Sequence, residues 1–497
     1  MQISTSQQDM GPDPPRGPSG RRLALHGSIL TLVGYGGAQL LRLGSNLVLA
    51  RLLFPDAFGL MALVAVFMHG LQMFTDIGLG PSIIHNKRGQ DPDFLHTAFT
   101  LQVLRGFLLW GLCWILAPMV TGFFAATDPD ATALIDLLPV AALTAVIGGF
   151  NSMGIHLLNR NMSLGIFTAL ELLPQLAATL VMILWALWSP SVWALVTGGL
   201  ASSLVRLMLS HIWNPGPRDR FGWDQECFSN LFNFGKWIFL STLVAFLAQN
   251  LDRILLGKLL TLAELGVYSI AMTFAKVPIH VSSRLSSTVL FPLLARLQEN
   301  PQALVNACLR ARQQVLWISG AVCLGFALTA PLFFSLLYDE RYSAAGGISQ
   351  WLALYVWSHV LVSSMDRIPL ALGQPKKLFQ SGLLTTLAML LALPGYALLG
   401  LPGFILSMSM ANLIAHGFLV AGLPEGRAPM LQQSLIITLS LLFYGLPLVL
   451  LLQDPFFDAH PWQHALAVVL GGVPPVLWGS WQLRRAMASK TDRAQVS

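Results

Sequence analysis

Apolar runs of about twenty residues recur along nearly the whole chain, and short connections rich in polar residues, proline or glycine separate them. Such runs are long enough to cross about 30 Å of hydrocarbon as α-helices, and the alternating ten-residue segments of a membrane β-barrel are absent from the sequence. The pattern predicts an all-α polytopic membrane protein. We expect fourteen spans, at approximately 27–53, 57–82, 94–122, 133–157, 162–187, 191–212, 231–256, 264–288, 314–338, 345–370, 378–399, 401–423, 431–452 and 462–483.

A corner motif between the first two predicted helices returns 207 residues later. ARLLFPDAFGLMAL, which begins at residue 50, aligns with GKLLTLAELGVYSI, which begins at residue 257. The alignment places Arg51 on Lys258 and Gly59 on Gly266. A proline ends the first helix of the motif, an aspartate suits the following N-cap, and the glycine allows close packing. The repeat therefore predicts two similar lobes of six helices each.

The repeat and the composition together divide the chain into six parts. The polar, Pro-, Gly- and Ser-rich start lacks the apolar core of a secretory signal, so we expect a disordered cytoplasmic tail there. The expected parts are a tail at 1–24, an N-lobe at 25–213, a cytoplasmic linker at 214–228, a C-lobe at 229–423, helices 13 and 14 at 424–485, and a second cytoplasmic tail at 486–497.

Composition and charge support this class of protein. The chain is 55% hydrophobic and only 10% charged, with a mean hydropathy of +0.64, whereas soluble domains carry about 25% charged residues. With the N-terminus inside, eighteen lysines and arginines, Arg312 among them, fall in inner segments. Only Arg51, Lys258 and Arg341 fall in outer ones. This asymmetry follows the positive-inside rule and predicts that both termini are cytoplasmic, and it explains the net charge of +6 without a nucleic-acid partner.

Two stretches resemble the polysaccharide-transporter branch of the MOP flippase superfamily, the Wzx-type flippases. They are NLVLARLLFPDAFGLMALVAVF, followed by FTDIGLGPSIIHNK, and NLDRILLGKLLTLAELGVYSIA at 250–271. The resemblance extends from about Gly27 onward. It implies a V-shaped, alternating-access fold with a cavity between the lobes lined by helices 1, 2, 7 and 8. It also implies transport of polyprenyl-pyrophosphate-linked oligosaccharides across the bacterial inner membrane, for exopolysaccharide, capsule or O-antigen synthesis.

Polar stripes in the predicted helices supply the candidate substrate-binding residues. Gln39, Arg42 and Asn46 share one face of helix 1. A charge deep in lipid costs at least ~2.5–3.5 kcal/mol, so Arg42 must face protein or water. Each stripe is also compatible with a buried hydrogen-bonding seam between packed helices. The remaining candidates are Arg51 and Lys258 at the outer mouth, Asp76 in helix 2, Gln249 and Arg253 in helix 7, and Lys276, His280 and Arg284 in helix 8.

The sign of the charges within the spans points to an anionic cargo. Cations outnumber anions there, and helices 1, 7 and 8 carry the surplus. Arginine can bind phosphate oxygens with a bidentate fork, and pyrophosphate is the anionic group that the resemblance implies. We expect no cofactor. A proton or sodium ion exchanged through Asp76 or His280 would add to or oppose the membrane potential, and the sequence leaves this coupling open.

Two alternatives remain beside the flippase. A MATE-type cation or multidrug antiporter shares the fold, but its cationic substrates favour a carboxylate in helix 1, where this chain has Arg42. A membrane glycan polymerase or ligase would be expected to have larger outer loops. The sequence contains no phosphate-binding loop for ATP and no His-Glu-x-x-His or paired-cysteine metal motif. Its four cysteines suggest no disulfide framework. A glycan polymerase and a chain-length regulator are the expected partners.

Overall fold

The computed structural model of the chain describes residues 36–75, 79–85, 88–160, 164–285, 301–366, 368–369, 374–423 and 426–452. Within these ranges the regular structure is entirely helical. Nine of the described helices are long and apolar enough to cross a membrane. The predicted tails and the fourteenth predicted helix lie outside the described residues.

The N-terminal part forms a series of antiparallel helices. A first helix is described from 36 to 52. It is followed by α2 (Pro55–Phe74), α3 (Leu79–His85), α4 (Pro92–Ala125), the 3₁₀ helix η1 (Pro129–Ala133), α5 (Leu134–Gly149), α6 (Gly154–Arg160), α7 (Leu164–Trp188) and α8 (Trp193–Ile212). The predicted spans 57–82 and 133–157 are thus each divided into two helices, α2 with α3 and α5 with α6.

The C-terminal part repeats the arrangement. Its elements are α9 (Gln225–Leu259), α10 (Leu262–Leu285), α12 (Pro301–Leu337), the 3₁₀ helix η3 (Glu340–Tyr342), α13 (Ala344–Ser363), α15 (Pro375–Met389), α16 (Ala392–Ala421) and α17 (Arg427–Leu451). The segment between α8 and α9 is irregular, and α9 begins at Gln225, inside the predicted linker 214–228. In contrast, α12 begins well before the predicted limit of 314.

The division between the eleventh and twelfth predicted helices occurs at Gly400. This residue has a positive φ of 63°, a conformation that glycine adopts without a Cβ clash. The backbones on its two sides touch, because a Cβ added to Gly403 would lie 2.1 Å from the carbonyl oxygen of Gly395. The chain therefore reverses direction inside α16, and α15 packs alongside α16. The break falls at the predicted division between 399 and 401.

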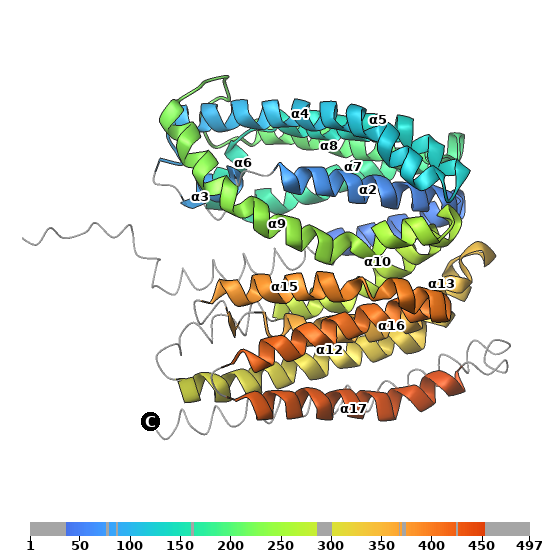
Figure 1. Cartoon of the computed structure of the whole chain (residues 1–497). Helices are drawn as coiled ribbons and strands as arrows, with labels where there is room; N and C mark the ends of the chain where they lie inside the picture. The colour runs from blue at the N-terminus through green and yellow to red at the C-terminus, as the bar shows by residue number, and fades with distance from the viewer. Residues whose placement is uncertain are drawn as a thin grey trace, which may run out of the picture.

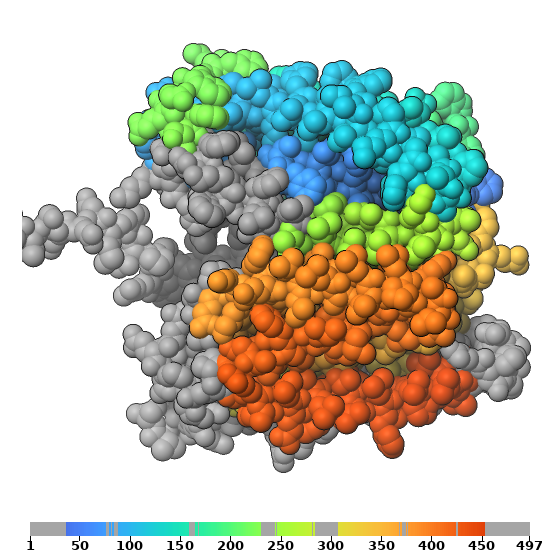
Figure 2. Space-filling model, viewed as in Figure 1, coloured from blue at the N-terminus to red at the C-terminus, as the bar shows by residue number. Residues whose placement is uncertain are grey.

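The helices form two halves that meet along α9 and α10. In Figure 1, α2, α4, α5, α7 and α8 lie in one half, and α12, α13, α15, α16 and α17 lie in the other. Helix α9 crosses obliquely between the halves, and α10 packs against both α2 and α13. Figure 2 shows the same division on the surface. One apolar core extends through both halves, from α2, α4 and α5 to α12, α13 and α16.

Arg312, counted among the inner-segment cations from sequence, is a buried residue of α12. The residue was predicted in an inner connection, but α12 extends past it and its side chain is completely buried. The guanidinium donates to Ser364 Oγ, Gln433 Oε1 and Ser434 Oγ, each at 2.9 Å. These acceptors lie at the end of α13 and in α17. Arg312 thus joins α17 to the rest of this half and is not a free surface charge.

Candidate substrate cavity and closed corner

A cavity of about 410 Å³ lies between the first helix, α2, α7, α9 and α10. Its volume falls within the 300–1,000 Å³ typical of small-ligand pockets. Three predicted site residues line it: Arg42 and Asn46 from the first helix, and Arg253 from α9. Gln175 and Thr179 of α7 form part of the same wall. The described lining contains two guanidinium groups and no carboxylate.

Neutral polar groups in the cavity wall bond mainly to helix carbonyls. Gln175 Nε2 donates to the carbonyl oxygen of Ala38 at 3.2 Å, one turn before Arg42. The hydroxyl of Thr179 donates to Gln175 O at 2.9 Å. The hydroxyl of Ser45 donates to Arg42 O at 2.9 Å. These bonds hold the polar groups in place without neutralising Arg42.

One further cation, Lys276, adds to the positive field of Arg253. Lys276 of α10 interacts electrostatically with Arg253, His69 and His280. His280 also interacts with Arg42. Asp252, 3% exposed, lies close enough to interact with Lys276 and accepts a hydrogen bond from Tyr268 Oη at 2.9 Å. The predicted stripes of helices 1, 7 and 8 therefore converge on one electrostatic environment.

The other predicted residues have different placements. Gln39 and Gln249 lie outside the described lining of the cavity. Asp76 lies outside the described residues, and so does the side chain of Arg284. The sequence reading did not identify Gln175 and Thr179. Their spacing of four residues on one helical face was the available signal.

Arg51 and Lys258 lie at the end of the bundle formed by the two repeated motifs, which we call the corner end. Arg51 Nε donates to the carbonyl oxygen of Leu337 at 3.1 Å. Lys258 Nζ donates to the carbonyl oxygen of Phe123 at 2.8 Å and lies over the ring of the same residue. Leu337 ends α12 and Phe123 lies near the end of α4, so each cation binds the opposite half of the molecule.

The connections after α4 and α12 complete this reciprocal closure. Asp128 and Asp339 are the N-caps of η1 and η3. Asp128 Oδ2 accepts a hydrogen bond from the backbone N–H of Leu262 at 3.0 Å. Asp339 binds the side chain of Arg341, which in turn donates to Arg51 O at 3.4 Å. The Arg341 guanidinium lowers the pKa of the Asp339 carboxyl below its ordinary value.

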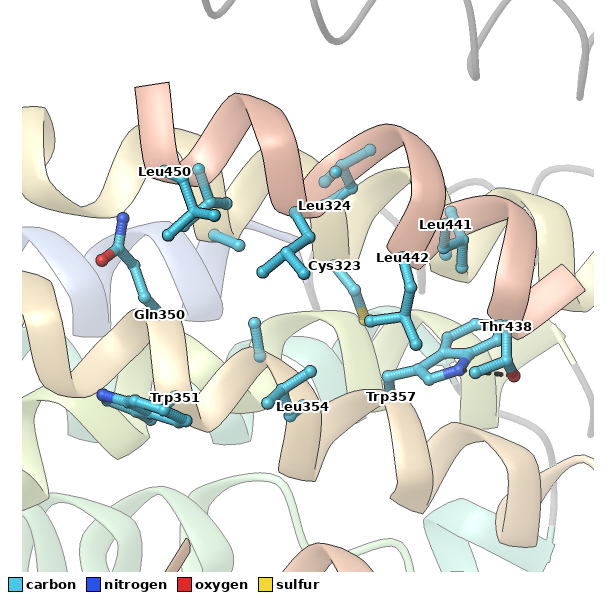
Figure 3. A pocket seen from close by; sticks show the side chains of 16 residues that line it. Cys323, Leu324, Gln350, Trp351, Leu354, Trp357, Thr438, Leu441, Leu442 and Leu450 are labelled. Carbon is cyan, nitrogen blue, oxygen red and sulfur yellow. Dashed lines mark hydrogen bonds between the residues drawn. The ribbon is translucent and has the colours of Figure 1, made fainter. Parts of the chain in front are cut away.

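A second cavity, of about 250 Å³, lies between α12, α13 and α17 and is shown in Figure 3. Leucines and two tryptophans dominate its lining, and Trp357 Nε1 donates to Thr438 Oγ1 at 3.0 Å. No charged side chain lies in the described lining. An anionic head group therefore fits the first cavity better than the second.

Comparison with known proteins identifies relatives of one kind. A family model described as "Polysaccharide biosynthesis protein" matches residues 48–346. The teichuronic acid biosynthesis protein TuaB of Bacillus subtilis is 21% identical over 61% of this chain and 62% of its own length. The succinoglycan biosynthesis transport protein ExoT of Rhizobium meliloti is 25% identical over 62% of this chain and 59% of its own length. The matches thus span about three fifths of these relatives.

Solved structures share the fold. The lipid II flippase MurJ in an inward closed conformation superposes with a TM-score of 0.72 at 15% identity, covering 93% of this chain and 100% of that one. An inward-facing MATE family multidrug resistance transporter of the MOP superfamily superposes with a TM-score of 0.58 at 17% identity, covering 80% of this chain and 95% of that one. At these identities the likeness establishes a shared all-helical fold.

Proposed function

Because the chain belongs to the polysaccharide biosynthesis protein family, we propose that it is a flippase for polyprenyl-pyrophosphate-linked oligosaccharide repeat units. The observation that carries this proposal is the pairing of Arg42 and Arg253 across one cavity that has no carboxylate in its described lining. Guanidinium groups bind phosphate oxygens with paired hydrogen bonds. The MurJ-like fold supports a transporter for such lipids, and the names of the relatives support a role in polysaccharide biosynthesis.

We propose an alternating-access mechanism in the bacterial inner membrane, with both termini cytoplasmic and the corner end facing outward. In this assignment the repeat defines lobes at 25–213 and 229–423. The reciprocal bonds of Arg51 and Lys258 then hold the outer mouth closed while the cavity accepts its cargo. Their separation would open the cavity to the outside.

The proposed driving force includes the membrane potential. Outward movement of an anion along an inside-negative potential gains ~2.3 kcal/mol per net charge per 100 mV. Exchange of a proton or sodium ion would add to this free-energy gain or oppose it. The proposed partners are a glycan polymerase and a chain-length regulator, which would receive the flipped repeat unit for exopolysaccharide, capsule or O-antigen assembly.

The MATE-type antiporter is less compatible with the cavity. A cationic substrate would meet Arg42 and Arg253, and like charges in a low-dielectric site repel strongly. A polymerase or ligase is also less compatible, because the corner-end connections between α4 and η1 and between α12 and η3 are only a few residues long.

Complementation of a strain that lacks the gene tests the proposed function. Arg42→Ala and Arg253→Ala should insert normally and yet reduce polymer export about tenfold or more, because a charged hydrogen bond contributes roughly 1.5–3 kcal/mol. Arg206→Ala is the control, since Arg206 lies on α8 outside the described cavity lining. Wild-type export by both cavity variants would contradict the assignment.

A further inference from the structure

We propose that the α7 wall of the cavity, together with Asn46 of the first helix, is a sugar-recognition surface that determines specificity for the first sugar of the cargo. The inference rests on the proposed function, because it assigns the neutral polar lining residues to the glycan and the two lining arginines to the pyrophosphate. The wall consists of Gln175 and Thr179, and Ser45 and Thr273 continue it on neighbouring helices.

The direction of the hydrogen bonds makes this wall rich in acceptors. Thr179 and Thr273 each donate their hydroxyl proton to a carbonyl four residues earlier, at 2.9 and 2.8 Å. Ser45 donates to Arg42 O. A hydroxyl that has donated its proton presents only lone pairs to a ligand. These three side chains therefore offer oxygen acceptors to the cavity.

Gln175 is oriented in the same sense. Its Nε2 donates to Ala38 O at 3.2 Å, which fixes the amide plane against the first helix. Its Oε1 has no hydrogen-bond partner in the described part of the chain and remains available as an acceptor. Asn46 lines the same cavity without a side-chain hydrogen bond to any described residue, so it offers both a donor and an acceptor.

The two kinds of polar side chain in the lining therefore complement two parts of one ligand. Arg42 and Arg253 present only donors, as an anionic pyrophosphate requires, and the α7 wall presents mainly acceptors. A sugar carries several hydroxyl protons, each of which needs an acceptor when it leaves water. The arrangement fits a polyhydroxylated group bonded directly to a phosphate.

Direct binding to purified protein in lipid nanodiscs tests the inference. The probes are a polyprenyl pyrophosphate, the same lipid carrying one glucose, and the corresponding polyprenol. Wild-type protein should bind the glucosylated lipid more tightly than the bare pyrophosphate. Gln175→Met combined with Thr179→Val should reduce that preference roughly fivefold for each acceptor removed, and should leave the affinity for the bare pyrophosphate unchanged.

Matched variants separate recognition from folding. Thr197→Val, at an intrahelically bonded threonine of α8 outside the described cavity lining, should retain the wild-type preference. If the double variant does not fold, Thr179→Val alone serves, because its hydroxyl bonds only within its own helix and valine preserves its shape. That single variant should lower the preference for the glucosylated lipid roughly fivefold.

The possible results are distinguishable. Equal affinity of the wild type for the glucosylated and bare lipids, or an unchanged preference in the folded variants, would overturn the sugar-recognition surface and leave the proposed function standing. Binding of both pyrophosphate lipids no tighter than that of the polyprenol would contradict the proposed function and the inference together.

Discussion

Gly59 and Gly266, which occupy equivalent positions in the internal repeat, form a reciprocal backbone contact between α2 and α10. A Cβ added to Gly59 would lie 2.0 Å from the carbonyl oxygen of Leu262. A Cβ added to Gly266 would lie 2.0 Å from the carbonyl oxygen of Pro55. Pro55 and Leu262 are themselves equivalent in the repeat. The two motifs therefore cross each other about a local pseudo-two-fold axis at the corner end.

Alanine at Gly59 or Gly266 should force the two halves apart at the corner end, because the obstructing atoms belong to the backbone and cannot rotate away. We expect a cysteine introduced at Asn46 to become more accessible to a membrane-impermeant maleimide in whole cells. Gly122→Ala is the matched control, since nothing lies within 4 Å of its added Cβ. Unchanged labelling in folded Gly59→Ala protein would show that the crossing does not close the cavity.

The two cations of the corner end should each control a different connection. Arg51→Ala removes the bond to Leu337 O, so hydrogen–deuterium exchange should rise around η3. Lys258→Ala removes the bond to Phe123 O, so exchange should rise around η1. One hydrogen bond contributes about 1 kcal/mol, which corresponds to roughly fivefold faster exchange. If either variant raised hydrogen–deuterium exchange equally around η1 and η3, the two cations would not control separate connections.

Arg312 should be required for folding. Arg312→Ala removes the charged donor from Ser364 Oγ, Gln433 Oε1 and Ser434 Oγ, and a hydrogen bond to a charged group contributes about 1.5–3 kcal/mol. We expect a much lower thermal stability of the detergent-solubilised protein. Arg310→Ala, at an exposed position two residues earlier on α12, is the control. Similar melting temperatures for the two variants would contradict the role of Arg312 in holding α17 to the rest of its half.

Sequence patterning predicted most of the fold, because the lipid environment requires long apolar segments to form helices. Long apolar runs must form helices, and the glycine–proline cluster around Gly400 could be located as a turn before the conformation was known. The start of α12 could not be predicted, because its first turns extend beyond the apolar run. The burial of Arg312 could not be predicted either, since an arginine that bonds to neutral partners on two other helices leaves no periodic signal.

The cavity was predictable only in part. Arg42, Asn46 and Arg253 stood out because polar residues are costly in apolar helices. Gln175 and Thr179 did not stand out, since neutral polar residues in a single helix are equally compatible with packing. The sequence also placed Arg51 and Lys258 at one end of the bundle. The bond of each cation to a carbonyl of the opposite half depends on the tertiary crossing of the two motifs, which the sequence does not show.

The capping role of Asp339 should depend on pH. Because Arg341 lowers its pKa, Asp339 stabilises the folded state above the ordinary carboxyl pKa of about 3.9. This contribution is lost as the pH falls through the lowered value. Asp339→Asn should therefore lower the melting temperature at pH 7 and have a diminishing effect below about pH 3.9. Asp130→Asn, at an exposed position in η1, is the control. A melting-temperature difference between wild type and Asp339→Asn that stayed the same in acid would contradict this role.

Transport by purified protein in liposomes tests the central claim most directly. A fluorescent oligosaccharide linked to polyprenyl pyrophosphate is placed in both leaflets, and its exposure to an external glycan-modifying enzyme is followed over time. We predict that the wild type and Arg206→Ala make the inner-leaflet lipid accessible far faster than empty liposomes do. Arg42→Ala combined with Arg253→Ala should slow this at least tenfold. Wild-type liposomes that expose the lipid no faster than empty ones would contradict the account.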